Sequence, residues 1–193
     1  MKKQKYNEEI VQDDFRGSHK RLTPELFEEL SKYKVKKSET ITRLHSEYEE
    51  PVIILRANYP GLNKMNESTK LIVKEVSINF EDIFKTRILY RQYYETLEGP
   101  IIFYVVRGDS KTLKENSIFI EENHDLGRFI DIDVYDVNDE YRISRMDLYY
   151  KPRNCFLCDK PAFECSRSKS HTEEELIDHL KSNLKEYLEK NKK

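Results

Sequence analysis

A seven-residue run, PVIILRA at positions 51–57, constrains the fold more than any other segment because it is almost wholly apolar. At this length, such a run indicates a buried β-strand rather than a helix. Turn-forming residues follow at 58–61, and an amphipathic pattern begins near residue 66. Its apolar side chains recur at helical spacing and are Ile72, Val76, Phe80 and Ile83. This part of the chain therefore predicts a strand, a loop and a helix in succession.

Other segments extend this unit into a sheet flanked by helices. Further strands are predicted at 87–94, 101–106, 117–121 and 129–137. Thr23 as N-cap and Pro24 in the first turn begin a helix that continues or resumes up to Glu49. Thr172 and Glu175 form the capping box of a terminal helix, whose apolar stripe is Leu176, Leu180, Leu184 and Leu188. We expect an α+β fold, with one mostly antiparallel sheet flanked by helices and a C-terminal helix.

Length and charge limit the organisation of the chain and its partners. The 193 residues suit a single domain, with a charged N-terminal arm at 1–22 and the folded domain at 23–193. The formal net charge of −2 provides no strongly basic field, so we expect neither nucleic acid nor a membrane surface as a partner. Without an apolar run of about 20 residues or a signal-peptide pattern, the expected location is the cytoplasm.

The segment HDLGRFIDIDV at 124–134 places two acids on a predicted strand. Because strand side chains alternate between faces, Asp131 and Asp133 are expected on one face and the aliphatic residues on the other. Two neighbouring carboxylates need a cation or a basic partner. A Mg²⁺ ion bound to both would suit phosphoryl or nucleotidyl transfer. The alternative is a solvent-facing strand whose acids keep it soluble.

Residues around the acids suggest an anion site. Gly127 permits a close backbone approach, and Arg128 offers a fork of donors. His124 could act as an acid, a base or a phosphate donor, although a histidine near a turn is more often structural. Downstream cations that an anionic, phosphate-rich substrate could use are Arg145, Lys151, Arg153, Arg167 and Lys169.

All three cysteines, with one histidine, form a compact cluster at 154–171. The series Cys155-x2-Cys158-x6-Cys165-x5-His171 supplies four ligands of the kind that bind Zn²⁺ tetrahedrally. The gaps after Cys158 match no standard zinc finger, and reduced cysteines that simply pack remain an alternative. A catalytic thiol is the least favoured interpretation. If zinc is present, we expect it to hold the loop in place rather than take part in a reaction.

The motifs form an ordered series along residues 124–171: Gly127-Arg128-x-x-Asp131-Ile132-Asp133-Val134, then Ile143-Ser144-Arg145-x-Asp147, then Arg153-x-Cys155-x-Leu157-Cys158, Ala162, Cys165-x-Arg167 and His171. Taken in this order, they resemble the citrate lyase holo-acyl-carrier-protein synthase family, also called apo-citrate lyase phosphoribosyl-dephospho-CoA transferase. A weaker similarity covers Pro60-Gly61-x-x-Lys64, whereas Asp125 stands where the family usually has proline.

The resemblance implies a nucleotidyltransferase that attaches a prosthetic group. Its donor would be 2'-(5''-triphosphoribosyl)-3'-dephospho-CoA, and its acceptor a serine of the apo-acyl carrier protein (the gamma subunit) of citrate lyase, with pyrophosphate released. Asp131 and Asp133 would hold Mg²⁺ on the triphosphate, and Asp147 would orient a ligand or accept a proton. Lys64, beside Gly61, would meet a phosphate. Arg128 and Arg145, with either Arg153 or Arg167, would neutralise the charge of the leaving pyrophosphate.

Three other functions compete with this interpretation. A zinc-knuckle module could bind nucleic acid through the basic residues around the cysteines, although the near-neutral charge argues against it. A metal-dependent phosphohydrolase could use the same two acids but would need no carrier protein. A non-enzymatic assembly factor is also compatible with the composition, and the ordered motifs disfavour it.

Overall fold

The computed structural model describes residues 23–138 and 142–191, so the predicted arm at 1–22 lies outside the described part. It contains a five-stranded sheet in the order β2-β3-β1-β4-β5. The strands are β1 (Val52–Ala57), β2 (Ile88–Thr96), β3 (Gly99–Val106), β4 (Ile130–Tyr135) and β5 (Arg142–Ile143). Every neighbouring pair is antiparallel. This confirms the predicted α+β domain.

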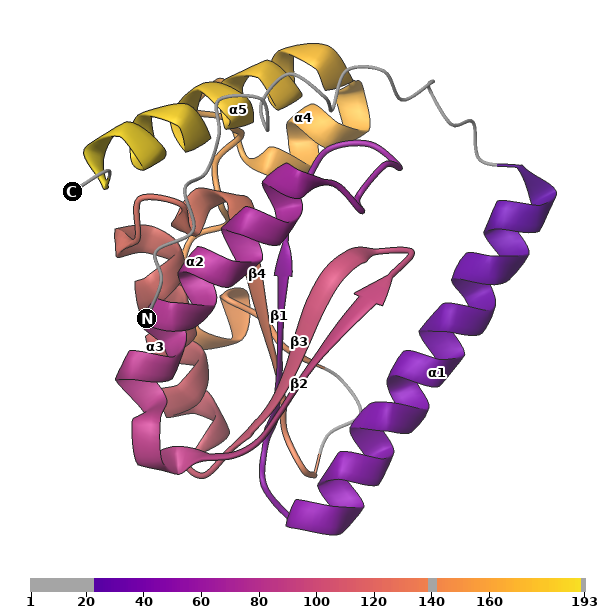
Figure 1. Cartoon of the computed structure of the whole chain (residues 1–193), viewed down its shortest axis with the longest axis vertical. Coiled ribbons are helices and arrows are strands. Elements are labelled where there is room, and N and C mark those ends of the chain that lie inside the picture. Colours follow the sequence, from indigo (N-terminus) through magenta and orange to yellow (C-terminus); the bar gives the residue numbers. More distant parts are fainter. Residues whose placement is uncertain (1–22, 139–141, 192–193) are drawn as a thin grey trace, which may run out of the picture.

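Helices cover both faces of the sheet (Figure 1). They are α1 (Pro24–Tyr48), α2 (Glu67–Phe84), α3 (Ser110–Asn123), α4 (Ala162–Ser168) and α5 (Glu173–Lys190). Residues of α2, α3 and α5 pack on one face, whereas α1 packs on the other. Three short 3-10 helices, η3 (Lys85–Arg87), η4 (Gly127–Phe129) and η5 (Met146–Leu148), join these elements. Within residues 23–138 and 142–191, no helix has both the length and the apolar character to cross a bilayer.

The central strand β1 is apolar on both faces because both are covered. Ile53 and Leu55 are buried in the core beneath α2, α3 and α5, while Val52 and Ile54 are buried in the smaller core beneath α1. By the alternation of strand side chains, Arg56 lies on the α1 face. A lone arginine in this strand therefore marks a polar region on an otherwise apolar face.

The predicted helix starts are confirmed at α1, α2 and α5. Thr23 Oγ1 accepts a hydrogen bond from the Leu26 N–H at 3.2 Å. Asn66 caps α2, and Thr172 with Glu175 caps α5 through reciprocal side-chain bonds. These bonds satisfy N–H groups that have no partner within the helix.

The predicted strand at 117–121 is wrong, because these residues lie within α3. Asp109 Oδ2 accepts from the Thr112 N–H at 2.8 Å and begins the helix. The buried positions recur every three or four residues and include polar side chains: Ser110, Leu113, Lys114, Ser117, Ile118, Ile120 and Glu121. A search for apolar residues alone misses this helical face. The apolar face predicted for α2 is also partly wrong. It included Ile83, which is 37% exposed, whereas the neighbouring Phe84 is buried.

Candidate functional site

Asp131 and Asp133 lie on one face of β4, as predicted, and the aliphatic residues that alternate with them, Ile130, Ile132 and Val134, are buried on the other. Arg56 is directly opposite Asp131 on β1. Its Nη2 is 3.0 Å from Asp131 Oδ2, and its Nε is 3.7 Å from Asp133 Oδ2. Burial lowers the pKa of Arg56, but the two carboxylates more than offset this effect and raise it overall. The basic partner that the acids need is thus a cross-strand arginine.

Two further arginines bind the outer oxygens of the pair. Arg142 Nη1 lies 2.7 Å from Asp133 Oδ1, and Arg153 Nη1 lies 3.2 Å from Asp131 Oδ1. All four carboxylate oxygens of Asp131 and Asp133 therefore have a guanidinium partner. The two acids organise three arginines around one end of β4.

A buried glutamate extends these contacts to α3. The Glu121 side chain is 2% exposed and forms ion pairs with Arg153 and, at 3.3 Å, with Arg145 Nη2. Glu121 Oε1 also accepts from the Ile132 N–H at 2.9 Å. Lys114 Nζ donates to the Ile132 carbonyl at 2.7 Å. These side chains satisfy the N–H and the carbonyl of Ile132, a residue of β4 that does not pair with the short strand β5.

We refer to these ion-paired residues as the acid–arginine network. Its members are Arg56, Glu121, Asp131, Asp133, Arg142, Arg145 and Arg153. Arg153 joins its two halves, because it contacts Asp131, Glu121 and the Ile130 carbonyl.

The acid pair as arranged does not fit Mg²⁺. This ion prefers carboxylate and water oxygens in octahedral geometry, whereas the oxygens of Asp131 and Asp133 are engaged by arginines. In the described part of the chain, no third acidic or histidine side chain joins them in a group of metal-binding size. We therefore assign no step to magnesium.

Lys64 lies close to this network, on the loop between β1 and α2. Its Nζ donates to the Tyr59 carbonyl at 2.8 Å. Burial and the Arg56 charge lower its pKa, although Asp131 acts in the opposite direction. Gly61 on the same loop has φ +75°, and a Cβ there would collide with the Glu173 carboxylate.

Arg128 lines a cavity of about 660 Å³. Its guanidinium stacks 4.5 Å from the centroid of the Phe156 ring, and its Nη2 donates to the Asn154 carbonyl. Its Nη1 is buried without a hydrogen-bond partner. Burial and the Arg153 charge lower the pKa of Arg128 to about 10. The cavity is lined mainly by the loop after β1, the Cys/His segment and the start of α5, including Gly61 and Lys169.

The four predicted zinc ligands converge beside this cavity. One donor atom from each of Cys155, Cys158, Cys165 and His171 lies within 4.8 Å of the others. The cysteines are free, Cys165 being buried and the other two half-buried. Burial and hydrogen bonds with the other two cysteines raise the pKa of Cys165 to about 11. The cluster is compatible with a structural metal, and the predicted loop at 154–171 includes the helix α4.

Three other predicted site residues lie apart from the acid pair, and two of them, Asp147 and Gly127, have local backbone contacts. Asp147 Oδ2 accepts from the Ser144 N–H at 2.7 Å, and this bond lowers the pKa of the exposed carboxyl. Arg167 is exposed in the last turn of α4. A Cβ on Gly127 would lie 2.6 Å from the carbonyl oxygens of Ile120 and Glu121, so its close backbone approach is to α3.

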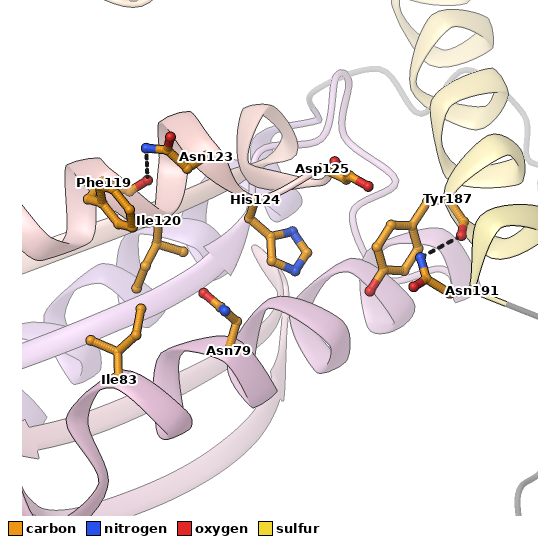
Figure 2. A pocket seen from close by; sticks show the side chains of 9 residues that line it. All are labelled: Asn79, Ile83, Phe119, Ile120, Asn123, His124, Asp125, Tyr187 and Asn191. Carbon is orange, nitrogen blue, oxygen red and sulfur yellow. Dashed lines mark hydrogen bonds between the residues drawn. The ribbon is translucent and has the colours of Figure 1, made fainter. Parts of the chain in front are cut away.

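His124 lies at a separate pocket of about 360 Å³ between α2, α3 and α5 (Figure 2). Its Nδ1 accepts from the Leu126 N–H at 2.9 Å, and its ring faces Tyr187 at a centroid distance of 5.8 Å. Burial lowers its pKa despite the nearby Asp125 and Glu75 charges. Because α2, α3 and α5 cover the sheet face opposite Arg56, the structure does not bring His124 together with the acid pair.

Sequence reasoning missed four residues of this region. Arg56 and Glu121 anchor the network, while Arg142 and Lys114 complete its contacts. Arg56 had a signal, because it is the single charge in the apolar run 51–57. Once α3 is recognised, Lys114 and Glu121 stand out as charges on its buried face.

Comparisons with known proteins agree with the motif series. A family model described as "CitX: Apo-citrate lyase phosphoribosyl-dephospho-CoA transferase" matches residues 27–187. The chain is 31% identical over 120 residues to Protein CitXG of Leuconostoc mesenteroides, covering 61% of this chain and 26% of that protein.

Two further relatives carry the transferase name. A probable apo-citrate lyase phosphoribosyl-dephospho-CoA transferase of Vibrio cholerae is 30% identical over 141 residues, which cover 71% of this chain and 79% of that protein. An Escherichia coli protein named apo-citrate lyase phosphoribosyl-dephospho-CoA transferase is 35% identical over 86 residues, covering 45% of this chain and 46% of that protein. The matched region thus spans about a quarter of the Leuconostoc protein and less than half of the Escherichia one.

Proposed function

The chain belongs to the apo-citrate lyase phosphoribosyl-dephospho-CoA transferase family, a family of enzymes, and from this premise we propose the reaction that it catalyses. The donor is 2'-(5''-triphosphoribosyl)-3'-dephospho-CoA, and its 5''-phosphoribosyl-dephospho-CoA part is transferred to a serine of the apo-acyl carrier protein of citrate lyase. The serine oxygen forms a bond to the α-phosphorus, and the bond from that phosphorus to the bridging oxygen of the β-phosphate breaks. Pyrophosphate leaves, and the serine proton passes to solvent. We expect this reaction in the cytoplasm.

The observation that carries this proposal is the environment of Arg128. A buried guanidinium nitrogen without an acceptor is costly, unless an anion completes its hydrogen bonds. The cavity that Arg128 lines is the size of a small-molecule site, and Lys169 also lines it. A triphosphate tail supplies the missing acceptors. Arg128 thereby neutralises charge that moves onto the leaving pyrophosphate.

The acid–arginine network has a positioning role in this proposal. Asp131 and Asp133 hold Arg56, Arg142 and Arg153 in fixed orientations through ion pairs. Arg153 acts electrostatically on Arg128, which links the network to the cavity. The acids therefore fix the charges that surround Arg128 and do not bind the phosphates of the donor themselves. Because the Asp147 carboxylate caps its own turn, we assign it no proton transfer.

Arg128→Gln tests the central step. The variant keeps a polar side chain but loses the charge, so kcat/KM for the donor should fall by about 100-fold. Transfer is measured as the mass increase of purified apo-carrier protein. Arg107→Gln is the matched control. Arg107 is 67% exposed and pairs with Glu50, and it follows the end of β3 that is distant from Arg128. Unchanged transfer by a folded Arg128→Gln protein would disprove this role.

A second assay separates the transferase from a phosphohydrolase. Pyrophosphate release should require the carrier protein, because its serine is the nucleophile. The enzyme is incubated with the donor alone and then with the carrier added. Equal pyrophosphate release in the two mixtures would favour hydrolysis instead. A structural Zn²⁺ at the Cys/His cluster is part of the proposed enzyme and lies outside this chemistry.

A further inference from the structure

The distances within the Cys/His cluster match those of a tetrahedral metal site. Cys158 Sγ lies 3.4 Å from Cys165 Sγ and 3.4 Å from His171 Nε2. In a tetrahedral site with Zn–S bonds of about 2.3 Å, neighbouring sulfurs are about 3.8 Å apart. The donors therefore need only small movements to coordinate one ion. The Cys158–Cys165 separation is also well above the roughly 2.05 Å of a disulfide bond.

Three separate segments bring these ligands together. Cys155 and Cys158 lie in a tight hairpin, in which the Cys155 N–H donates to the Lys160 carbonyl at 2.7 Å and Asn154 pairs with Pro161. Cys165 comes from α4, and His171 immediately precedes the N-cap of α5. In Figure 1, α4 and α5 lie next to each other at one end of the molecule. One ion would join the hairpin, α4 and α5.

The segment that contains the Cys/His cluster lacks an apolar core of its own. From residue 142 to residue 179, Cys165 is the one buried residue among those that the structure describes. A short segment with so little burial needs a staple such as a metal or a disulfide. Because the donors are three sulfurs and an imidazole, they favour zinc over the hard ions Mg²⁺ and Ca²⁺.

We propose that Cys155, Cys158, Cys165 and His171 bind one Zn²⁺ in a closed structural site. Binding releases three thiol protons and leaves His171 neutral. The site has no open position for a substrate or water, so the metal does not act as a Lewis acid. Its structural effect extends to Arg128, which stacks on Phe156 next to Cys155 and bonds to Asn154. That last consequence rests on the proposed function, whereas the metal site does not.

Metal content of the full-length protein tests the site directly. Protein purified under reducing conditions should contain about one zinc per chain by elemental analysis. Replacement with Co²⁺ should give the visible absorption of a tetrahedral thiolate site. Cys158→Ala and His171→Ala should each weaken Co²⁺ binding by at least about 100-fold, because loss of a ligand costs no less than loss of its supporting contacts. His45→Ala removes a half-buried histidine of another element and should leave binding unchanged.

Hydrogen exchange provides a readout that does not need an active or mutated enzyme. Removing the metal from the wild-type protein should speed exchange in residues 154–171 while exchange in β1 stays the same. Absence of stoichiometric metal, or Co²⁺ spectra of the wild-type form in both ligand variants, would overturn the proposal. A wild-type protein that binds the metal but does not transfer the group to the carrier protein would instead count against the proposed reaction.

Discussion

Glu121 and Glu122 are neighbouring acids on α3 that both bind Arg145, but only Glu121 is buried. Glu121→Gln removes the charge that pairs with Arg145 and Arg153. Since those guanidinium groups remain partly buried, the free energy of unfolding should fall by about 3 kcal/mol. Glu122→Gln, at a side chain that is 50% exposed, should cost less than about 1 kcal/mol. Chemical denaturation of both variants measures the difference, and equal losses would contradict a network anchored on Glu121.

At the residue scale, the sequence predicts one part of the candidate site and misses another. Alternation along a strand places Asp131 and Asp133 on one face, and the structure confirms this. The partner of the acids could not be predicted, because the pairing of β1 with β4 depends on contacts between distant segments. Arg56 reaches Asp131 only through that register. The sequence alone therefore left metal and arginine as open alternatives.

At the scale of elements, the junction between α3 and η4 explains the glycine at position 127. A methyl group there would lie 2.6 Å from the carbonyl oxygens of Ile120 and Glu121, and backbone atoms cannot move aside easily. Gly127→Ala should therefore lower the free energy of unfolding by about 1–3 kcal/mol. Thermal unfolding measures this loss. A stability equal to or above that of the wild type would contradict this. It would mean that the lower conformational entropy of the unfolded variant outweighs the steric clash in the folded state.

Elements with local start signals were predictable from sequence, and α3 was not recognised. The helices α1 and α5 begin at the predicted capping residues, and α2 begins near residue 66 as predicted. The helix α3 has such a cap in Asp109, but its buried face mixes apolar and polar side chains. Two of its polar members, Lys114 and Glu121, are satisfied by hydrogen bonds with the backbone of Ile132 in β4. Tertiary contacts thus override the apolar pattern of 117–121, which by itself resembles a strand.

At the scale of the whole molecule, the two faces of the sheet serve different purposes. The face beneath α2, α3 and α5 carries the larger apolar core. The face beneath α1 carries a smaller core and, along β1 and β4, the polar end that contains Arg56 and the acid pair. The charged side chains Lys114 and Glu121 of α3 reach β4 from the side of the larger core, so the network contacts this strand from both faces. This division of roles follows from strand alternation in β1 and β4.

Two half-buried histidines, His45 and His124, make the stability of the whole molecule depend on pH. Burial lowers the pKa of His124 and of His45 from 6.5, so the unfolded chain takes up protons at a higher pH than the folded chain does. Their contribution is complete above pH 6.5 and is lost as the pH falls through that value toward the folded pKa. His124→Asn keeps an acceptor for the Leu126 N–H but cannot titrate. Its free energy of unfolding should therefore fall less than that of the wild type between about pH 7.5 and about pH 5.5. Denaturation curves measured across this range give both slopes, and identical slopes would show that His124 titrates alike in both states.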